Sequence, residues 1–197
     1  MPSDADTQDS LDADIRHCLT VLQSGGLILY PTDTIWGIGC DATNSEAVSK
    51  VFALKRRAET KSLIVLMTDQ RDILRYTSRP DPGIFDFLKT VTKPTTVIYE
   101  GAIGLAPNLI NADGTVGIRL VTDDFCRHLI KRFRKPIVST SANISGEPAP
   151  AFYREIDARI LAEVDYIVHH RRDDETPKQP STIIKWNADG PPTIIRP

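Results

Sequence analysis

The sequence has few cysteines and no long apolar run, and each shortage argues against a class of protein. Its 197 residues include three cysteines, Cys18, Cys40 and Cys126. A small, odd and widely spaced set predicts neither a disulfide framework nor a zinc site, and it favours a reducing, cytoplasmic setting. No segment approaches the roughly 18 apolar residues of a membrane span, and residues 1–14 are too acidic and polar for a signal peptide. We therefore expect a soluble protein.

Several common catalytic motifs are also missing. The sequence contains no GxxxxGK[ST] P-loop, GxGxxG fingerprint, HExxH helix or GxSxG elbow. Their absence disfavours a standard NTPase, dehydrogenase, zincin or α/β-hydrolase. The four histidines are His17, His128, His169 and His170. They fall on predicted helix faces or at a strand end, so we expect no catalytic triad.

The charge balance is close to neutral, although the basic residues are clustered. A formal net charge of -2 does not predict extensive wrapping of nucleic acid. Basic clusters lie at residues 55–57, 131–135 and 169–172. Such clusters either serve an anionic ligand or lie on solvated helix ends and loops.

Hydrophobic patterning predicts one α/β domain over residues 10–197, after a poorly ordered tail at 1–9. Short apolar runs predict strands within 27–30, 62–67, 95–100, 115–120, 136–140, 166–170, 181–186 and 192–197. Helical spacing predicts helices at 10–24, 45–54, 123–134 and 152–164, with one or two more across 69–89. The interleaving favours a twisted mixed sheet with helical layers. We expect Ser45 to cap the second helix and the polar loop 171–180 to be mobile.

Four polar segments next to predicted strands are the candidates for ligand binding. They are PTDTIWGIG at 31–39, KRRAETKS at 55–62, STSANISGEP at 139–148 and PSTII at 180–184. Each alone is also compatible with a hydrogen-bonded turn. Together they offer cations, hydroxyls and amides, which bind phosphates and carboxylates in phosphoryl or nucleotidyl transfer.

These segments resemble the YrdC-like family. PTDTIWGIGCDA, the Lys-x-Arg of Lys55 and Arg57, TVGIR at 115–119, STSANISGEP, PSTII and IIRP occur in that family's order and approximate spacing. The likeness covers roughly residues 10–197 and implies a single-domain, twisted, mixed parallel/antiparallel sheet flanked by helices. It also implies a nucleotidyltransferase, threonylcarbamoyl-AMP synthase. Such an enzyme makes L-threonylcarbamoyladenylate and diphosphate from L-threonine, bicarbonate and ATP with Mg²⁺, for N6-threonylcarbamoyladenosine at tRNA position 37.

The resemblance also implies roles for individual residues. The catalytic set around the nucleotide phosphates would be Lys55, Arg57, Ser141 and Asn143. Further ATP contacts would be Lys61, Thr115 and Arg196. The threonine-binding residues would be Thr34, Arg119, Ser139 and Ser181, with Arg119 binding the carboxylate. No protein ligands for a metal are implied, so Mg²⁺ would be held by ATP oxygens and water.

Other residues of the same motifs have more than one interpretation. Trp36 either walls the pocket or is a core aromatic, and Asp33 is expected to orient the turn. Gly37 and Gly39 would allow close approach of the backbone. Arg56 has no role in the resemblance and is expected at the surface.

The sequence departs from the family pattern in two places. KRRA followed by KSL stands where the family usually reads Lys-Gly-Arg-Pro followed by Lys-Pro-Leu, so Ala58 and Ser62 replace prolines. VTKPTT stands where the family has Trp-Pro-Gly-Pro. These changes retain the charges, but they alter the loops around the triphosphate and leave full synthase turnover open.

Two other functions fit the same resemblance. One is a double-stranded RNA- or tRNA-binding module without synthase activity, which a steep salt dependence of tRNA binding would support. The other is a carbamoyl-transfer partner similar to hydrogenase-maturation proteins. A synthase would need downstream threonylcarbamoyl-transfer proteins, which the sequence does not identify.

Overall fold

The computed structural model describes residues 4–58, 62–187 and 189–197. The helices are α1 (Asp4–Gln23), α2 (Ser45–Leu54), α3 (Gln70–Tyr76), α4 (Pro82–Thr90), α5 (Asp124–Phe133) and α6 (Ala158–Glu163), with 3-10 turns η1 (Pro107–Leu109) and η2 (Tyr153–Glu155). The strands are β1 (Ile28–Tyr30), β2 (Gly37–Gly39), β3 (Ile64–Met67), β4 (Thr95–Tyr99), β5 (Val116–Leu120), β6 (Ile137–Ser141), β7 (Tyr166–Ile167), β8 (Thr182–Lys185) and β9 (Thr193–Arg196).

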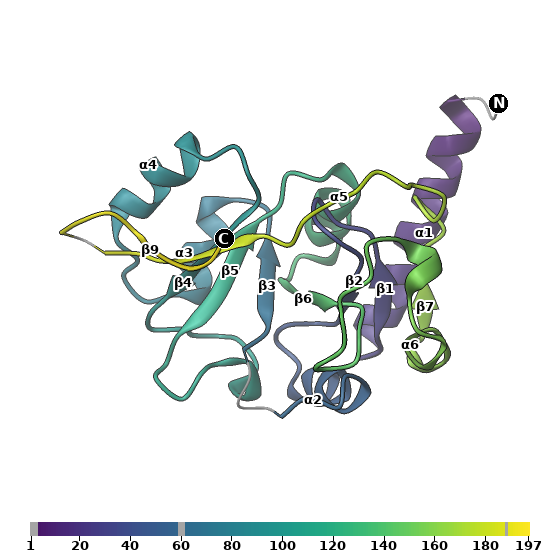
Figure 1. Cartoon of the computed structure of the whole chain (residues 1–197), viewed down its shortest axis with the longest axis horizontal. Helices are drawn as coiled ribbons and strands as arrows, with labels where there is room; N and C mark the ends of the chain where they lie inside the picture. Colours follow the sequence, from purple (N-terminus) through teal and green to yellow (C-terminus); the bar gives the residue numbers. More distant parts are fainter. Residues whose placement is uncertain (1–3, 59–61, 188) are drawn as a thin grey trace.

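The strands form one mixed sheet in the order β7-β1-β2-β6-β3-β5-β4-β8-β9, counted over the described residues. Parallel pairs join β1 to β7, β3 to β5 and β4 to β8. The other neighbours are antiparallel. This is the single-domain α/β fold with a mixed sheet and flanking helices that the sequence predicts (Figure 1).

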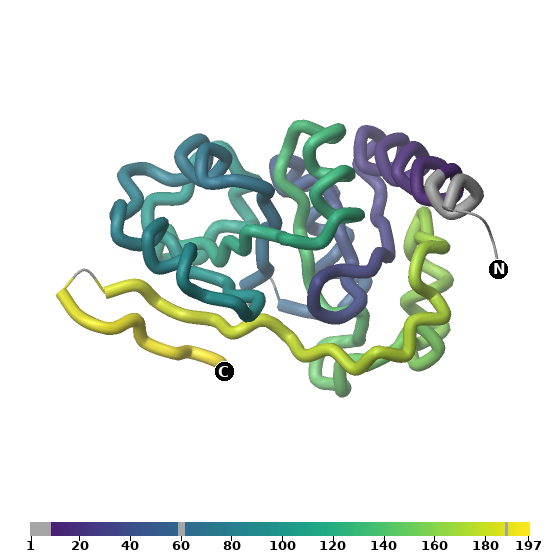
Figure 2. The backbone as a smooth tube through the Cα atoms, turned by 90° about the horizontal axis from the view of Figure 1, so that it is seen from above, coloured from purple at the N-terminus to yellow at the C-terminus, as the bar shows by residue number. Residues whose placement is uncertain are grey.

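The helices α1 and α5 lie side by side against one face of the sheet (Figure 2). The helix α5 buries Phe125, Leu129 and Phe133, whose spacing forms one apolar face. Its N-terminus is capped by the Asp123 side chain, which accepts a hydrogen bond from the Cys126 amide. On the opposite side, a segment at residues 168–181 runs from β7 to β8, and β8 continues it toward the far end of the molecule (Figure 2).

Some predicted boundaries differ from the structure. The helix α1 begins at Asp4 and so extends into residues 1–9, which were expected to be poorly ordered; the domain boundary at residue 10 stays a prediction. Asn44, not Ser45, is the N-cap of α2, because its side chain accepts from the amides of Glu46 and Ala47. The helix predicted at 152–164 is divided into η2 and α6.

The strand β2 was not predicted, because Gly37–Gly39 lies inside a segment that reads as a loop. It pairs with β1 on one side and β6 on the other. A Cβ atom at Gly39 would lie 2.6 Å from the Tyr30 ring and 2.9 Å from the Val138 carbonyl oxygen. The glycine therefore lets β2 fit between its neighbours, rather than freeing the backbone for a ligand.

Two further observations concern the predicted setting of the chain. None of the helices in the described residues is long and apolar enough to cross a membrane. Cys18, Cys40 and Cys126 are all buried and free. Burial raises the pKa of each thiol, so none is activated as a nucleophile.

Candidate active site

A cavity of about 510 Å³ lies over the middle of the sheet. All four polar segments contribute to its wall, together with β4, β5 and β9. The predicted site residues that line it are Thr34, Arg57, Arg119, Ser139, Ser141, Ser181 and Arg196. Residues separated by more than a hundred positions in sequence thus line one cavity. Four unrelated hydrogen-bonded turns would not be expected to converge in this way.

Three arginines make the cavity wall strongly basic. Arg57, Arg119 and Arg196 all line it. Burial lowers the pKa of Arg57, and burial together with the neighbouring charge of Arg119 lowers the pKa of Arg196. Guanidinium groups stay charged at neutral pH despite such shifts, so the wall attracts anionic groups.

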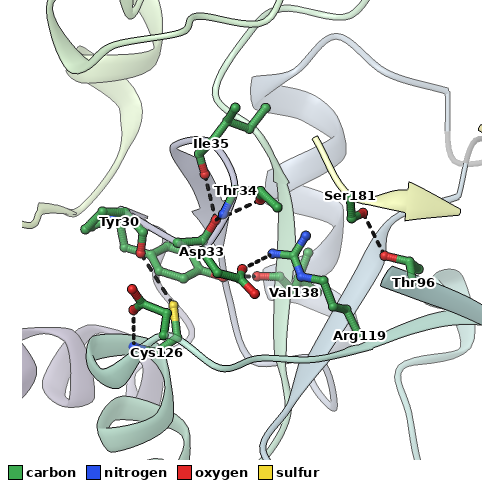
Figure 3. A network of polar contacts seen from close by, with 12 residues as sticks. Tyr30, Asp33, Thr34, Ile35, Thr96, Arg119, Cys126, Val138 and Ser181 are labelled. Carbon is green, nitrogen blue, oxygen red and sulfur yellow. Dashed lines mark hydrogen bonds and ion pairs between the residues drawn. The ribbon is translucent and has the colours of Figure 1, made fainter. Parts of the chain in front are cut away.

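The Arg119 guanidinium is paired with Asp33 inside the protein (Figure 3). Their Nη2 and Oδ1 atoms are 3.0 Å apart, and the two side chains are only 3% and 9% exposed. The Arg119 Nε is buried without a hydrogen-bond partner in the described residues. Asp33 was expected to orient a turn, whereas the structure directs its carboxylate to a cavity arginine. Arg119 also lines the cavity, and a guanidinium group there suits a carboxylate from a ligand.

Next to Arg119 lies a second polar group built from β4, the residue before β8, and β9. The Ser181 and Thr96 hydroxyls are 2.8 Å apart and buried (Figure 3). Arg196 Nη2 donates to the Ser181 carbonyl oxygen at 2.9 Å. The strand β9 is exposed at every residue, so Arg196 reaches the cavity from an edge strand.

The loop 31–36 forms another wall. Thr34 is 4% exposed, and its hydroxyl lies 2.9 Å from that of Thr32, which also donates to the Ile35 carbonyl. Trp36 is buried and lines the cavity, with its ring centroid 5.0 Å from that of Tyr153. Trp36 is therefore both a wall of the cavity and a core aromatic residue.

Lys55 is buried under the wall rather than exposed on it. Its side chain is 1% exposed, and Nζ donates to the Ser141 carbonyl and, at 2.6 Å, to the Asn143 carbonyl. Burial, followed by the charge of Arg57, lowers its pKa to about 7. Among the described residues, the wall includes Ser141 but neither Lys55 nor Asn143. Lys55 thus holds the Ser-x-Asn turn in this state.

A chain of hydrogen bonds connects Arg57 with Thr115. Arg57 Nη2 donates to the Ser62 carbonyl at 2.9 Å, and the Ser62 hydroxyl donates to Asn111 Oδ1 at 2.7 Å. Asn111 Nδ2 in turn donates to the Thr115 hydroxyl at 2.9 Å. Thr115 is buried behind Asn111, which lines the cavity. No motif indicated Asn111, and Lys61 lies outside the described residues.

The site offers cations and hydroxyls but no cluster of metal-ligating side chains. In the described ranges, no group of three or more histidines, cysteines and carboxylates is placed to hold a metal ion. The arrangement suits catalysis by positioning and by neutralising negative charge, without a covalent protein intermediate.

These features define the chain as an α/β protein with a basic cavity over a mixed sheet. A family model for Sua5, YciO and YrdC proteins, described as "Telomere recombination", matches residues 20–197. The chain belongs to the Sua5/YciO/YrdC family, which confirms the resemblance read from its motifs.

Relatives in this family carry the name of a nucleotidyltransferase-type enzyme. The threonylcarbamoyl-AMP synthase of Pseudoalteromonas translucida is 30% identical over 172 residues, which cover 86% of this chain and 91% of that protein. The threonylcarbamoyl-AMP synthase of Stenotrophomonas maltophilia is 30% identical over 157 residues, covering 78% and 84%.

A solved structure shares the fold. P. abyssi Sua5 complexed with L-threonine superposes with a TM-score of 0.81 and 23% identity, covering 93% of this chain and 53% of that one. At this identity the superposition shows the fold alone. This chain spans about half the length of that Sua5 protein.

Proposed function

We propose that this chain is a threonylcarbamoyl-AMP synthase that forms L-threonylcarbamoyladenylate and diphosphate from L-threonine, bicarbonate and ATP. The convergence of Arg57, Arg119 and Arg196 on one cavity supports the proposal most directly. ATP carries about four negative charges and a carboxylated threonine two more, so several cations must meet at one site. The relatives named as this synthase support the same activity.

In this reaction the threonine amine and bicarbonate first give an N-carboxythreonine and water. The new carboxylate then attacks the α-phosphorus of ATP, and the bond to the leaving diphosphate breaks. Arg119 would bind the threonine carboxylate, beside the Ser139 and Ser181 hydroxyls, and Thr34 would bind the threonine side of the substrate. These groups act by orientation and charge neutralisation.

The nucleotide would bind in the same cavity. Arg57, Arg196 and Ser141 line it and would contact the phosphates. Lys55, Asn143 and Thr115 lie behind them and would reach ATP after a local rearrangement or hold the groups that do. Mg²⁺ would enter as part of the MgATP substrate, held by phosphate oxygens and water, because the described residues provide no carboxylate cluster for it.

The adenylate would serve N6-threonylcarbamoyl modification of adenosine 37 in tRNA, through a downstream transfer protein. A cytoplasmic location belongs to the same proposal and agrees with the three free, buried cysteines.

The test is diphosphate release by the purified protein with ATP, Mg²⁺, bicarbonate and L-threonine. We expect release to require both threonine and bicarbonate and to yield an acid-labile adenylate. Turnover with another amino acid in place of threonine would change the substrate class. Intact ATP binding without turnover, together with steeply salt-dependent tRNA binding, would favour the RNA-binding alternative.

A further inference from the structure

The segment 168–181, here called the crossover segment, passes along the outer side of the loop 31–36 (Figure 2). A second, smaller cavity of about 20 Å³ separates the two. Thr32, Thr34 and Trp36 line it from the loop, and Arg171, Asp174, Thr176 and Lys178 line it from the crossover segment. Thr34 and Trp36 also line the main cavity, so this loop is a thin wall with the candidate site on one side and residues 171–178 of the crossover segment on the other.

Arg171 is the side chain that joins the crossover segment to this wall. Its Nη2 atom lies 2.7 Å from Asp123 Oδ2, and Nη1 donates to the Thr32 carbonyl at 3.4 Å. The Arg171 and Asp123 side chains are 19% and 12% exposed, so solvent screens the pair only partly. The other Asp123 oxygen caps α5 by accepting from the Cys126 amide at 3.0 Å. The Asp123 carboxylate therefore both caps α5 and holds the Arg171 guanidinium.

The loop is held from outside at two consecutive carbonyls. The Cys126 thiol donates to the Pro31 carbonyl at 3.4 Å, and Arg171 donates to that of Thr32. The next residue, Asp33, is the partner of Arg119 inside the cavity. A shift of the outer carbonyls would therefore move both the Asp33 carboxylate and the neighbouring Thr34 hydroxyl.

The backbone at Arg171 is unusual and sets it apart from its neighbour. Arg171 has φ +64°, a left-handed conformation that a residue with a Cβ adopts only where its surroundings fix it. Arg172 instead turns back toward β7, donating to the carbonyls of Val168 at 2.8 Å and Ile167 at 2.6 Å, and its guanidinium lies 5.0 Å from the centroid of the Tyr153 ring. The two adjacent arginines thus differ in what they hold.

We propose that Arg171, paired with Asp123, is a positioning residue for the threonine-binding side of the active site. It sets the place of Thr34 and Asp33 by holding the outer face of the loop 31–36. Arg57 lies in a different segment, anchored to Ser62, so its position against the phosphates does not depend on this contact. The inference rests on the proposed function for the identity of the substrate, but not for the contact itself.

The test compares Arg171→Gly with the matched control Arg172→Gln. Glycine removes the guanidinium, and because it lacks Cβ it adopts the left-handed backbone at this position without steric cost, so the variant is expected to fold. We expect Arg171→Gly to raise KM for threonine about tenfold, as for loss of one charge-assisted contact, with KM for ATP within about twofold of wild type. Arg172→Gln should leave both constants within about twofold.

Asp123→Asn provides the second half of a double-mutant cycle. Asparagine keeps the oxygen that caps α5 but removes the charge that pairs with Arg171. Asp123→Asn should also raise KM for threonine. The double variant should have a KM for threonine no higher than that of the single variant with the higher value. Additive losses would show that the two residues act separately and would overturn the proposal.

Amide hydrogen exchange of residues 31–36 gives a measurement that needs no turnover. We expect faster exchange there in Arg171→Gly than in wild type or Arg172→Gln, even if the wild-type protein releases no diphosphate. That result without wild-type activity would reject the proposed function and leave the positioning contact standing. Equal exchange and equal kinetics in the two arginine variants would overturn the positioning role, as would parallel losses for ATP and threonine.

Discussion

Replacing Arg56 by glycine should stabilise the protein. Arg56 follows α2 with φ +50°, and the amides of Arg56 and Arg57 donate to the carbonyls of Ala53 and Phe52, both at 2.9 Å. This pattern is a Schellman motif, in which glycine is the usual residue at the left-handed position. A side chain there costs about 1–2 kcal/mol. Glycine gives back roughly 0.4–1 kcal/mol through greater freedom of the unfolded chain.

The net gain in unfolding free energy for Arg56→Gly should therefore be about 0.5–1 kcal/mol. In a chain of this size the melting temperature should rise by about 1–4 °C. The measurement is reversible denaturant unfolding alongside a thermal melt. Arg56→Ala is the control: it removes the same exposed side chain but keeps Cβ, so its stability should stay within about 0.5 kcal/mol of wild type. An equal gain in both variants, or a loss in Arg56→Gly, would refute the backbone argument.

Three other variants test the site. Arg57→Ala should lower ATP affinity or turnover about tenfold to a hundredfold, and Arg56→Ala far less, in the diphosphate assay; equal small effects would contradict the phosphate assignment. Thr34→Val should weaken threonine binding in calorimetric titration while ATP binding stays near normal; unchanged threonine binding in a stable variant would remove Thr34 from the site. Because burial lowers the pKa of Lys55 to about 7, unfolding takes up a proton between that pH and the ordinary value of 10.5. Wild-type stability should then rise with pH across this window by up to about 1.4 kcal/mol per unit, and Lys55→Met should lack this contribution; identical pH dependence would contradict it.

The sequence predicts most of the sheet because its strands are short, apolar and separated by polar segments. Runs such as those at 62–67 and 136–140 correspond to β3 and β6, where burial on both faces selects continuous apolar residues. The strand β2 could not be found in this way. Its two glycines have low strand propensity, and its conformation depends on fitting between β1 and β6.

The candidate site was predictable as a set of segments but not as a set of contacts. The family resemblance implied that Arg57, Arg119 and Arg196 belong to one site, and the structure places all three on one cavity. The Asp33 pair with Arg119 was not foreseen, because it depends on how the loop after β1 meets a strand far along the chain. Lys55 was expected to face the phosphates, but the turn at the end of α2 directs it under the Ser-x-Asn segment.

The exposed edge strand β9 links substrate binding to local unfolding. β9 is hydrogen-bonded only to β8 in the described sheet, yet it supplies Ile195 and Arg196 to the cavity. Fraying of this strand would open one wall and remove a cation while the central strands stay folded. Any ligand that contacts Arg196 must therefore suppress that fraying, by an amount set by its own binding free energy. Amide protection in β9 then reports occupancy of the cavity.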